Sequence, residues 1–300
     1  MNENSDPWVV VGQARSKRAL RDAELVLRSQ GIPFVLEPRD GAYVLGVPHA
    51  SAEVAQRELT RFATEEREHV PESVQPVQTG IYWWHGVVLY AATLILGHVF
   101  ATARAFGFDW YANGSADAGR IRAGEAWRTV TSLCLHSDVP HLGSNLLYGA
   151  LFGGLVAYAN GGGVAFLAML LAGALGNAIN ALAQDPSHLS VGASTAVFGA
   201  VGLLSGSEWR RRVLLRAGPM RRFAPVFLAL ALFAWLGIGE NPEVQRIDVF
   251  AHAFGVLAGL GLGVALAALP DGTAKHPGVQ RLAGGAALVL VAAAWAVALS

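Results

Sequence analysis

Residues 191–202 read VGASTAVFGAVG, an apolar stretch with two adjacent hydroxyl residues, Ser194 and Thr195, near its start. Its glycines and alanines are typical of membrane helices that pack closely. Serine and threonine in such helices often only bond a backbone carbonyl or a neighbouring helix. The stretch therefore leaves two interpretations of Ser194, a packing residue or a nucleophile.

The composition indicates a membrane protein. Of the 300 residues, 53% are hydrophobic and 15% are charged, whereas soluble domains have about 25% charged residues. The formal net charge is zero, which gives no indication of a nucleic-acid partner. The single cysteine, Cys134, excludes an intrachain disulfide and a cysteine metal cluster.

Seven apolar runs follow residue 80, each near the ~20 residues that cross ~30 Å of hydrocarbon. They lie near 82–103, 141–159, 163–183, 191–207, 223–239, 248–269 and 283–299. The fourth and fifth runs are short and the last reaches residue 300, so seven spans or six are expected. The predicted fold is an all-α polytopic membrane protein with a small N-terminal α+β domain.

The predicted domains divide the chain in four. Residues 1–68 have the pattern of a soluble β-α-β-β-α domain, half of a ferredoxin-like unit, with no catalytic or phosphate-binding motif. Residues 69–80 form a polar linker with two prolines, and 81–270 form the membrane core. Residues 271–300 add a loop and a further C-terminal transmembrane helix.

The basic residues predict the orientation. Most of the 22 lysines and arginines would lie on the same side as the N-terminus, including six arginines in 208–222. Because cytoplasmic loops are enriched in Lys and Arg, we expect a cytoplasmic N-terminus. The expected location is a bacterial inner or cell membrane, with the chain as a multi-pass integral protein.

Polar residues on three of the runs would share one depth near the outer surface. The fourth run enters from outside at about Val191, which puts Ser194 roughly 5 Å along it. The sixth run carries His252, and the second opens with His141 and has Asn145 one turn deeper. Since polar groups at membrane depth are costly, these four residues are candidates for a functional site.

Their chemistry suits acyl transfer. A serine hydroxyl is a weak nucleophile until a base accepts its proton, and a neutral, partly desolvated histidine can act as that base. The Asn145 amide, the His141 ring and the Ser194 backbone N–H could stabilise an oxyanion. A soluble hydrolase elbow, G-x-S-x-G, does not fit, because Ala196 replaces the second glycine and the context is helical.

Together these residues resemble the rhomboid family of intramembrane serine proteases over roughly residues 82–270. The matching positions are Gly192, Ser194 and Gly199 in GASTAVFG, His252, Gly255 and Gly259 in HAFGVLAG, and His141 and Asn145 in HLGSN. The resemblance implies a Ser–His dyad without an acid, in which Ser194 is the nucleophile and His252 the base. It also implies oxyanion stabilisation by the HLGSN pair and close approach of the sixth helix to the fourth at its glycines. In GEAWRTVTSLCLH it implies supporting roles for Trp127, Arg128 and His136 in the first outer loop.

Thr195 departs from the family pattern, because many members have glycine after the nucleophile. A β-branched side chain there narrows the space and could crowd the oxyanion site. Asp248, four residues before His252, has two interpretations, an orienting third residue of the site or a helix N-terminal carboxylate. We interpret His188 as solvated near the site entrance. Asn177 and Asn180 are expected to form interhelical hydrogen bonds.

The expected function is an intramembrane serine endopeptidase without cofactor or metal. Its partners would be the lipid bilayer and transmembrane substrates with helix-weakening residues, and the partner of the N-terminal domain is unknown. The fifth helix and the loop at 240–248 would form a mobile gate. Two alternatives remain: an inactive rhomboid-like protein that binds membrane clients, and a small transporter, which should show polar groups through the membrane or a repeat.

Overall fold

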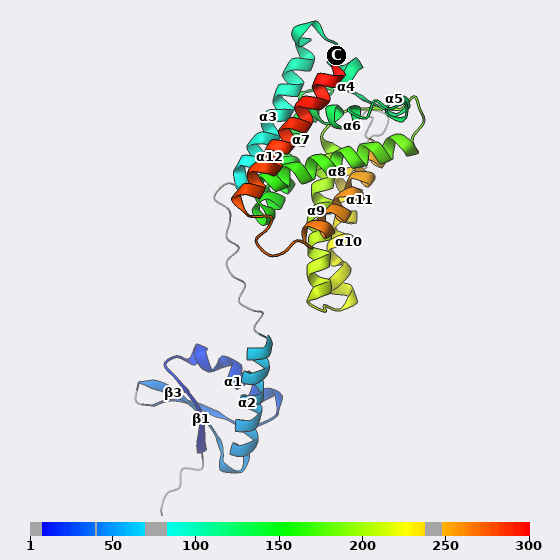
Figure 1. The fold of residues 1–300 in the computed structure, drawn as a ribbon. Coiled ribbons are helices and arrows are strands. Elements are labelled where there is room, and N and C mark those ends of the chain that lie inside the picture. The colour runs from blue at the N-terminus through cyan, green and yellow to red at the C-terminus, as the bar shows by residue number, and fades with distance from the viewer. Residues whose placement is uncertain (1–7, 40, 70–82, 238–247) are drawn as a thin grey trace, which may run out of the picture. The chain divides into compact units, whose positions relative to one another are not determined.

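The computed structural model describes residues 8–39, 41–69, 83–237 and 248–300, without the side chains at 65–69 and 236–237. The chain divides into two compact units, Met1–Val77 and Gln78–Ser300. Each unit has its own hydrophobic core. Figure 1 labels helices and strands of both units.

The first unit is a three-stranded sheet with two main helices. Its elements are β1 (Trp8–Ala14), α1 (Arg21–Ser29), β2 (Val35–Arg39), β3 (Ala42–Pro48) and α2 (Ala52–His69). Strand β3 lies between β1 and β2 and is antiparallel to both, so β1 and β2 run parallel. This is the split βαβ arrangement that half of a ferredoxin-like unit requires.

The core of this unit forms where the helices cover the sheet. Leu45 and Val47 of β3 are fully buried, together with Leu27 of α1 and Ala55 of α2. Alternate positions of a strand face opposite sides, which explains why Leu45 and Val47 face the same core. The element order is the one that the sequence predicts. The predicted linker lies almost entirely outside the described residues.

The second unit contains seven long helices in its described part. They are α3 (Trp83–Thr102), α7 (Val139–Asn160), α8 (Gly162–Ala183), α9 (Ser194–Leu214), α10 (Pro219–Gly237), α11 (Val249–Leu266) and α12 (Pro277–Ala298). Short elements fill the α3–α7 connection, namely α4 (Trp110–Gly114), β4 (Ala116–Asp117), α5 (Ala118–Arg122) and α6 (Arg128–Thr131). Strand β5 (Leu189–Ser190) precedes α9 and pairs with β4.

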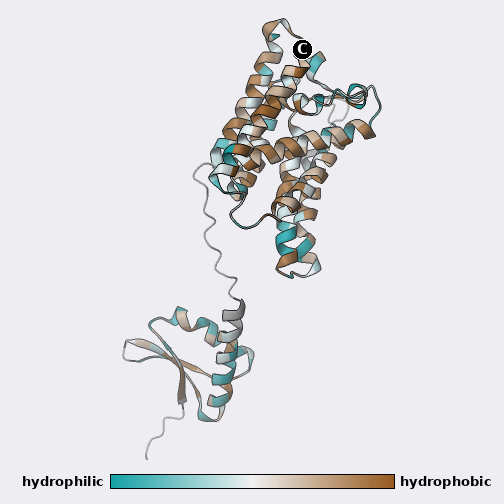
Figure 2. Ribbon diagram, in the orientation of Figure 1, coloured by the Kyte–Doolittle hydropathy of each residue, from teal (hydrophilic) through white to brown (hydrophobic). Residues whose placement is uncertain are grey.

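Five of these helices are long and apolar enough to cross a membrane: α3, α7, α8, α11 and α12. Figure 2 shows apolar residues along most of the bundle and polar residues at one end of α9 and α10. Helix α9 is not in that set of five, since its last turns carry Glu208 and the arginines at 210–212. The predicted class, an all-α polytopic membrane protein with a small N-terminal α+β unit, is confirmed.

Helix α8 lies at the centre of the bundle and packs against α3, α7, α9, α11 and α12. Its sequence is rich in glycine and alanine, which lets backbones approach closely. A Cβ atom added at Gly173 would lie 2.8 Å from the Cβ of Ala196, and one at Gly176 would lie 2.7 Å from Cγ2 of Thr195. Helix α8 therefore fixes the start of α9 through direct contacts.

Helix α12 is attached to the bundle at both ends. Near its start, Oε1 of Gln280 accepts hydrogen bonds from the backbone N–H groups of Gly163 at 2.8 Å and Val164 at 3.2 Å. Near its end, the ring of Trp295 packs on Trp110 of α4 with centroids 4.5 Å apart. These contacts connect α12 with the start of α8 and with the α3–α7 connection.

Candidate active site

Ser194 is the first residue of α9. The sequence predicts that this helix enters near Val191, but the structure corrects that expectation. Gly192 has a φ of +128°, a backbone conformation incompatible with a right-handed helix. The helix therefore begins only after Ala193, and Ser194 lies at its N-terminal end rather than 5 Å along it.

Ser194 and His252 are in hydrogen-bond contact. Nε2 of His252, in the first turn of α11, lies 2.8 Å from Oγ of Ser194. The histidine is 6% exposed, and its ring stacks on Phe198 with centroids 4.5 Å apart. Phe198 is one turn beyond Ser194, so both residues face α11. The aromatic ring fixes the imidazole plane beside the serine hydroxyl.

Glycines allow α9 and α11 to come this close. A Cβ at Gly255 would overlap the carbonyl oxygen of Thr195, and a Cβ at Gly259 would overlap that of Gly199. A Cβ at Gly199 would in turn lie 2.6 Å from the Cβ of Ala172 on α8. The three helices therefore meet backbone to backbone, directly beneath the pair.

His141 and Asn145 lie one turn apart on α7. Asp138 caps this helix by accepting a hydrogen bond from the His141 N–H at 2.7 Å. The Asn145 amide donates to the His141 carbonyl at 2.9 Å, which leaves its second N–H for another acceptor. A Cβ at Gly192 would lie 2.7 Å from Nε2 of His141, so the imidazole lies against the segment that precedes Ser194.

The other nitrogen of His141 contacts Ser137. Nδ1 lies 3.1 Å from Oγ of Ser137, whose hydroxyl donates to the Asp138 carboxylate at 2.9 Å. With the hydroxyl proton on the carboxylate side, Nδ1 must be the donor to Ser137. A neutral His141 would then have an unprotonated Nε2. Whether Nε2 of His141 carries a proton therefore depends on the hydrogen bonds that Ser137 forms with His141 and Asp138.

A cavity of about 1260 Å³ connects these groups. Its lining includes Ser194, His252, His141 and Asn145. Apolar residues line one part and polar residues another: Tyr148, Phe152, Val197, Phe198 and Val201 form the first set, and Tyr111, Ser115, Ser137, Asp138 and Ser190 belong to the second. Within the described ranges, no three His, Cys, Asp or Glu residues are arranged to hold a metal ion.

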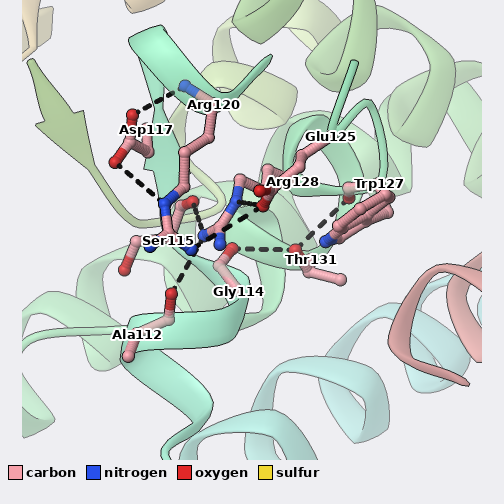
Figure 3. A network of polar contacts seen from close by, with 9 residues as sticks. All are labelled: Ala112, Gly114, Ser115, Asp117, Arg120, Glu125, Trp127, Arg128 and Thr131. Atoms are coloured by element: carbon pink, nitrogen blue, oxygen red, sulfur yellow. Dashed lines mark hydrogen bonds and ion pairs between the residues drawn. The ribbon is translucent and has the colours of Figure 1, made fainter. Parts of the chain in front are cut away.

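Arg128 organises the α3–α7 connection (Figure 3). Its guanidinium is 2% exposed and donates to Glu125 at 2.6 Å and to the carbonyls of Ala112 and Ser115 at 3.1 and 3.0 Å. The hydroxyl of Thr131 donates to the Gly114 carbonyl at 2.8 Å, and the backbone N–H of Thr131 donates to the carbonyl of Trp127. These bonds hold α4 against α6 and satisfy carbonyls that are buried in the loop.

His136 connects this loop with the residue that precedes Ser194. It is fully buried, and its Nε2 accepts a hydrogen bond from the N–H of Ala193 at 3.4 Å. Tyr111 donates its hydroxyl proton to the His136 carbonyl at 2.6 Å. Burial, reinforced by the neighbouring His141 and His98, lowers the pKa of His136 to about 3. The ring therefore stays neutral and accepts the Ala193 N–H.

Thr195 does not crowd the cavity. Its methyl group lies in the space above Gly176 of α8 and its carbonyl lies against Gly255 of α11. Thr195 is 3% exposed, and it is not one of the described residues that line the cavity. The expectation that Thr195 narrows the oxyanion site is therefore wrong. A helix rotates successive side chains by about 100°, which directs Thr195 away from the face that carries Ser194.

Asp248 lies at the N-terminus of α11, in agreement with its interpretation as a helix N-terminal carboxylate, and it also contacts two segments that the sequence does not connect with it. Oδ1 of Asp248 accepts from the Ala251 N–H at 3.0 Å, which makes Asp248 the N-cap of α11. Oδ2 contacts Asn180 and His188, each at 2.7 Å. His188 is therefore an ion-pair or hydrogen-bond partner rather than a solvated side chain. The i+4 spacing from Ser194 could have predicted that Phe198 lies on the same face of the helix. No local pattern predicts the contact between His188 and Asp248.

Asn177 connects α8 with the α3–α7 connection. Its amide donates to the Thr129 carbonyl at 3.0 Å and to the Ser132 hydroxyl at 3.1 Å. Asn180 reaches the start of α11 instead. The two asparagines thus form hydrogen bonds with different segments of the unit, as expected of residues that connect helices.

The fold and the site define a helical, multi-pass membrane protein in which Ser194, at the start of α9, contacts the buried His252 in the first turn of α11. A model of the Rhomboid domain matches residues 123–269. The chain belongs to the rhomboid family. This match includes His141, Asn145, Ser194 and His252.

Named relatives come from different organisms. The chain is 31% identical to Rhomboid-like protein 11, chloroplastic, of Arabidopsis thaliana over 153 residues, covering 49% of this chain and 55% of the relative. It is 27% identical to Rhomboid protease GluP of Bacillus subtilis (strain 168) over 228 residues, covering 73% of this chain and 42% of the relative. It is 34% identical to Rhomboid-like protease 3 of Toxoplasma gondii over 151 residues, covering 50% of this chain and 55% of the relative. The chain thus spans about half the length of these relatives.

Proposed function

We propose that this chain is an intramembrane serine endopeptidase in which Ser194 is the nucleophile and His252 the general base. The observation that carries the proposal is the 2.8 Å contact between Oγ of Ser194 and Nε2 of His252, beside a large cavity. Hydrogen-bond contact with a base is the geometry that activates a serine. The similarity to a named rhomboid protease supports the same reaction.

In the first step, His252 accepts the hydroxyl proton at Nε2 while its own proton is on Nδ1. Oγ of Ser194 attacks the substrate carbonyl carbon, and the carbonyl oxygen becomes an oxyanion. The protonated histidine then donates the proton to the leaving amine as the C–N bond breaks. Water, deprotonated by His252, hydrolyses the acyl-enzyme and restores the serine.

The oxyanion would form near the N-terminus of α9. The Ser194 backbone N–H belongs to the first turn, where the helix dipole also favours negative charge. The free N–H of Asn145 and Nε2 of His141 supply further donors. His141 donates from Nε2 when Ser137 donates to its Nδ1, or when the ring is protonated. Asp138 beside Ser137 stabilises the protonated form.

The proposed substrates are transmembrane segments with Gly, Pro or other helix-weakening residues near the cleavage point. An intact helix keeps its carbonyls in i→i−4 hydrogen bonds, so it must unwind before Ser194 can attack. The proposal includes a cytoplasmic N-terminus, which places the cavity towards the outer face of the membrane. The N-terminal unit would then contact cytoplasmic partners.

The proposed gate is α10 together with residues 240–248. Helix α10 packs on α9 and contains Pro225, which removes one backbone hydrogen bond from its interior. Most of the loop lies outside the described residues. A disulfide between engineered cysteines on α10 and α7 should block cleavage and reduction should restore it. Full cleavage by the oxidised protein would exclude this gate.

The decisive experiment compares wild type with Ser194→Ala and His252→Ala in liposomes that contain a transmembrane reporter. A matched control is Ser205→Ala, which removes a buried hydroxyl three turns further along α9. We expect cleavage by wild type and Ser205→Ala and none by the other two. A fluorophosphonate probe provides a substrate-independent test. A folded wild type that neither cleaves nor reacts would favour the client-binding alternative.

A further inference from the structure

Three donors surround the carboxylate of Asp248. The Ala251 N–H binds Oδ1 at 3.0 Å, while Nδ2 of Asn180 and Nε2 of His188 both bind Oδ2 at 2.7 Å. The aspartate side chain is 10% exposed and that of His188 28% exposed. The two contacts of Oδ2 are short, as is typical of hydrogen bonds to a carboxylate, and the carboxylate itself has little access to water.

The donors come from three different segments of the site. Asn180 is in the last turn of α8, and His188 is six residues before Ser194. The carbonyl of His188 accepts from the N–H of Ala118, so its backbone is also fixed. The Asp248 carbonyl accepts from the N–H of His252 at 3.1 Å. Asp248 therefore connects the loop that precedes Ser194, through His188, with the backbone of His252.

Helix capping alone does not explain this arrangement. A serine at position 248 would accept the Ala251 N–H equally well, because capping uses one side-chain oxygen. Within the described residues, Oδ1 of Asn180 is buried without a hydrogen-bond partner, which costs free energy. Nδ2 of the same side chain nevertheless donates to Asp248 at 2.7 Å, which indicates a role for this hydrogen bond beyond helix capping.

We propose that Asp248, His188 and Asn180 form a positioning clamp that fixes the start of α11, and with it His252, relative to Ser194. The inference rests on the proposed function and names its positioning residues. The clamp residues do not exchange protons with the substrate. Their effect is geometric, since small misplacement of a reacting pair slows a reaction by large factors.

Asp248→Ser tests the clamp and keeps the helix cap. His188→Ala removes one donor, whereas His188→Gln restores an N–H donor of similar reach. Asp185→Ser is the matched control, because Asp185 is exposed in the same loop and its carboxylate accepts hydrogen bonds only from the N–H and the hydroxyl of Ser187 among the described residues. The measurements are fluorophosphonate labelling of Ser194, kcat and KM for the reporter, and thermal unfolding in detergent.

We expect labelling about tenfold slower and kcat reduced with unchanged KM in Asp248→Ser and His188→Ala. His188→Gln and Asp185→Ser should stay near wild type. A purely structural role would lower the unfolding temperature and leave the labelling rate of folded molecules unchanged. That result, or a defective His188→Gln, overturns the proposal.

A double-mutant cycle on unfolding separates this inference from the proposed function. If the unfolding effects of Asp248→Ser and His188→Ala are not additive, the two side chains are coupled, whether or not the protein is active. Additive effects overturn the clamp. If the cycle shows coupling between Asp248 and His188 but the folded wild type does not react with the fluorophosphonate, the proposed catalysis and the positioning role are both overturned. The contact between the two side chains would still stand.

Discussion

The backbone of Gly255 on α11 lies directly against the carbonyl oxygen of Thr195, the residue after Ser194. His252 is three residues before this glycine, on the same helix. The distance between the side chains of Ser194 and His252 is therefore set by the lack of a side chain at Gly255, one turn away. Rigid helices transmit that spacing to the side chains they carry.

Gly255→Ala should displace α11 and separate His252 from Ser194. The new Cβ would overlap the Thr195 carbonyl, which as backbone cannot rotate away. We expect at least a tenfold loss of Ser194 labelling and a destabilisation of about 1–3 kcal/mol. The control is Gly261→Ala on the same helix, where no atom lies within 4 Å of the new Cβ. Equal labelling by both variants would contradict this explanation.

Gly192→Ala should disturb both the backbone that precedes Ser194 and the side chain of His141. The substitution forces a φ of +128° on alanine and places a Cβ 2.7 Å from Nε2 of the imidazole. Reporter cleavage should fall more than tenfold. Gly272→Ala is the control, because this glycine also has a positive φ, +79°, but has no neighbour within 4 Å. A similar loss of cleavage in the control would show that backbone strain alone is responsible.

Much of the site could be predicted from the sequence because helical spacing is local. The i and i+4 positions of His141 and Asn145 follow from α7, and the order of motifs identifies the segments that carry Ser194 and His252. The start of α9 could not be predicted, since it depends on the φ of Gly192. The contact of His188 with Asp248 joins residues 60 positions apart. Such contacts arise from tertiary packing, which no local pattern encodes.

Thr195 illustrates the same distinction. Its sequence position next to Ser194 suggests crowding, but the helix turns its side chain towards Gly176. Adjacent residues on a helix do not face the same side. The consequence of a substitution at this position therefore depends on the neighbours of α9 rather than on the distance along the chain.

Thr195→Gly should lower stability and leave the reaction largely unchanged. The variant removes a buried methyl group between α8 and α9 and adds a glycine to the first turn of a helix, at a cost of about 1–2 kcal/mol. Fluorophosphonate labelling of the folded protein should remain within threefold of wild type. Labelling that increases tenfold would show that the threonine restricts the oxyanion site after all.

Arg128→Lys should destabilise the α3–α7 connection despite keeping the charge. One ammonium cannot replace the planar fork that binds Glu125 and two carbonyls. Because the group is buried, we expect a loss of about 3 kcal/mol in the free energy of unfolding. The control is Arg120→Lys, whose side chain is 56% exposed and should change stability by less than about 0.5 kcal/mol. Equal effects would show that the charge alone matters.

His136 should make the protein less stable in acid. Its pKa is about 3 in the folded protein and about 6.5 in an unfolded chain. Between these values the unfolded chain binds a proton that the folded protein does not, so stability falls as pH decreases from about 6.5 towards 3. The contribution is at most about 1.4 kcal/mol per pH unit. His136→Gln retains an acceptor for the Ala193 N–H and does not titrate. Unfolding in detergent at pH 7, 6 and 5 should therefore show a smaller decrease for this variant, and an identical decrease would exclude His136 as its source.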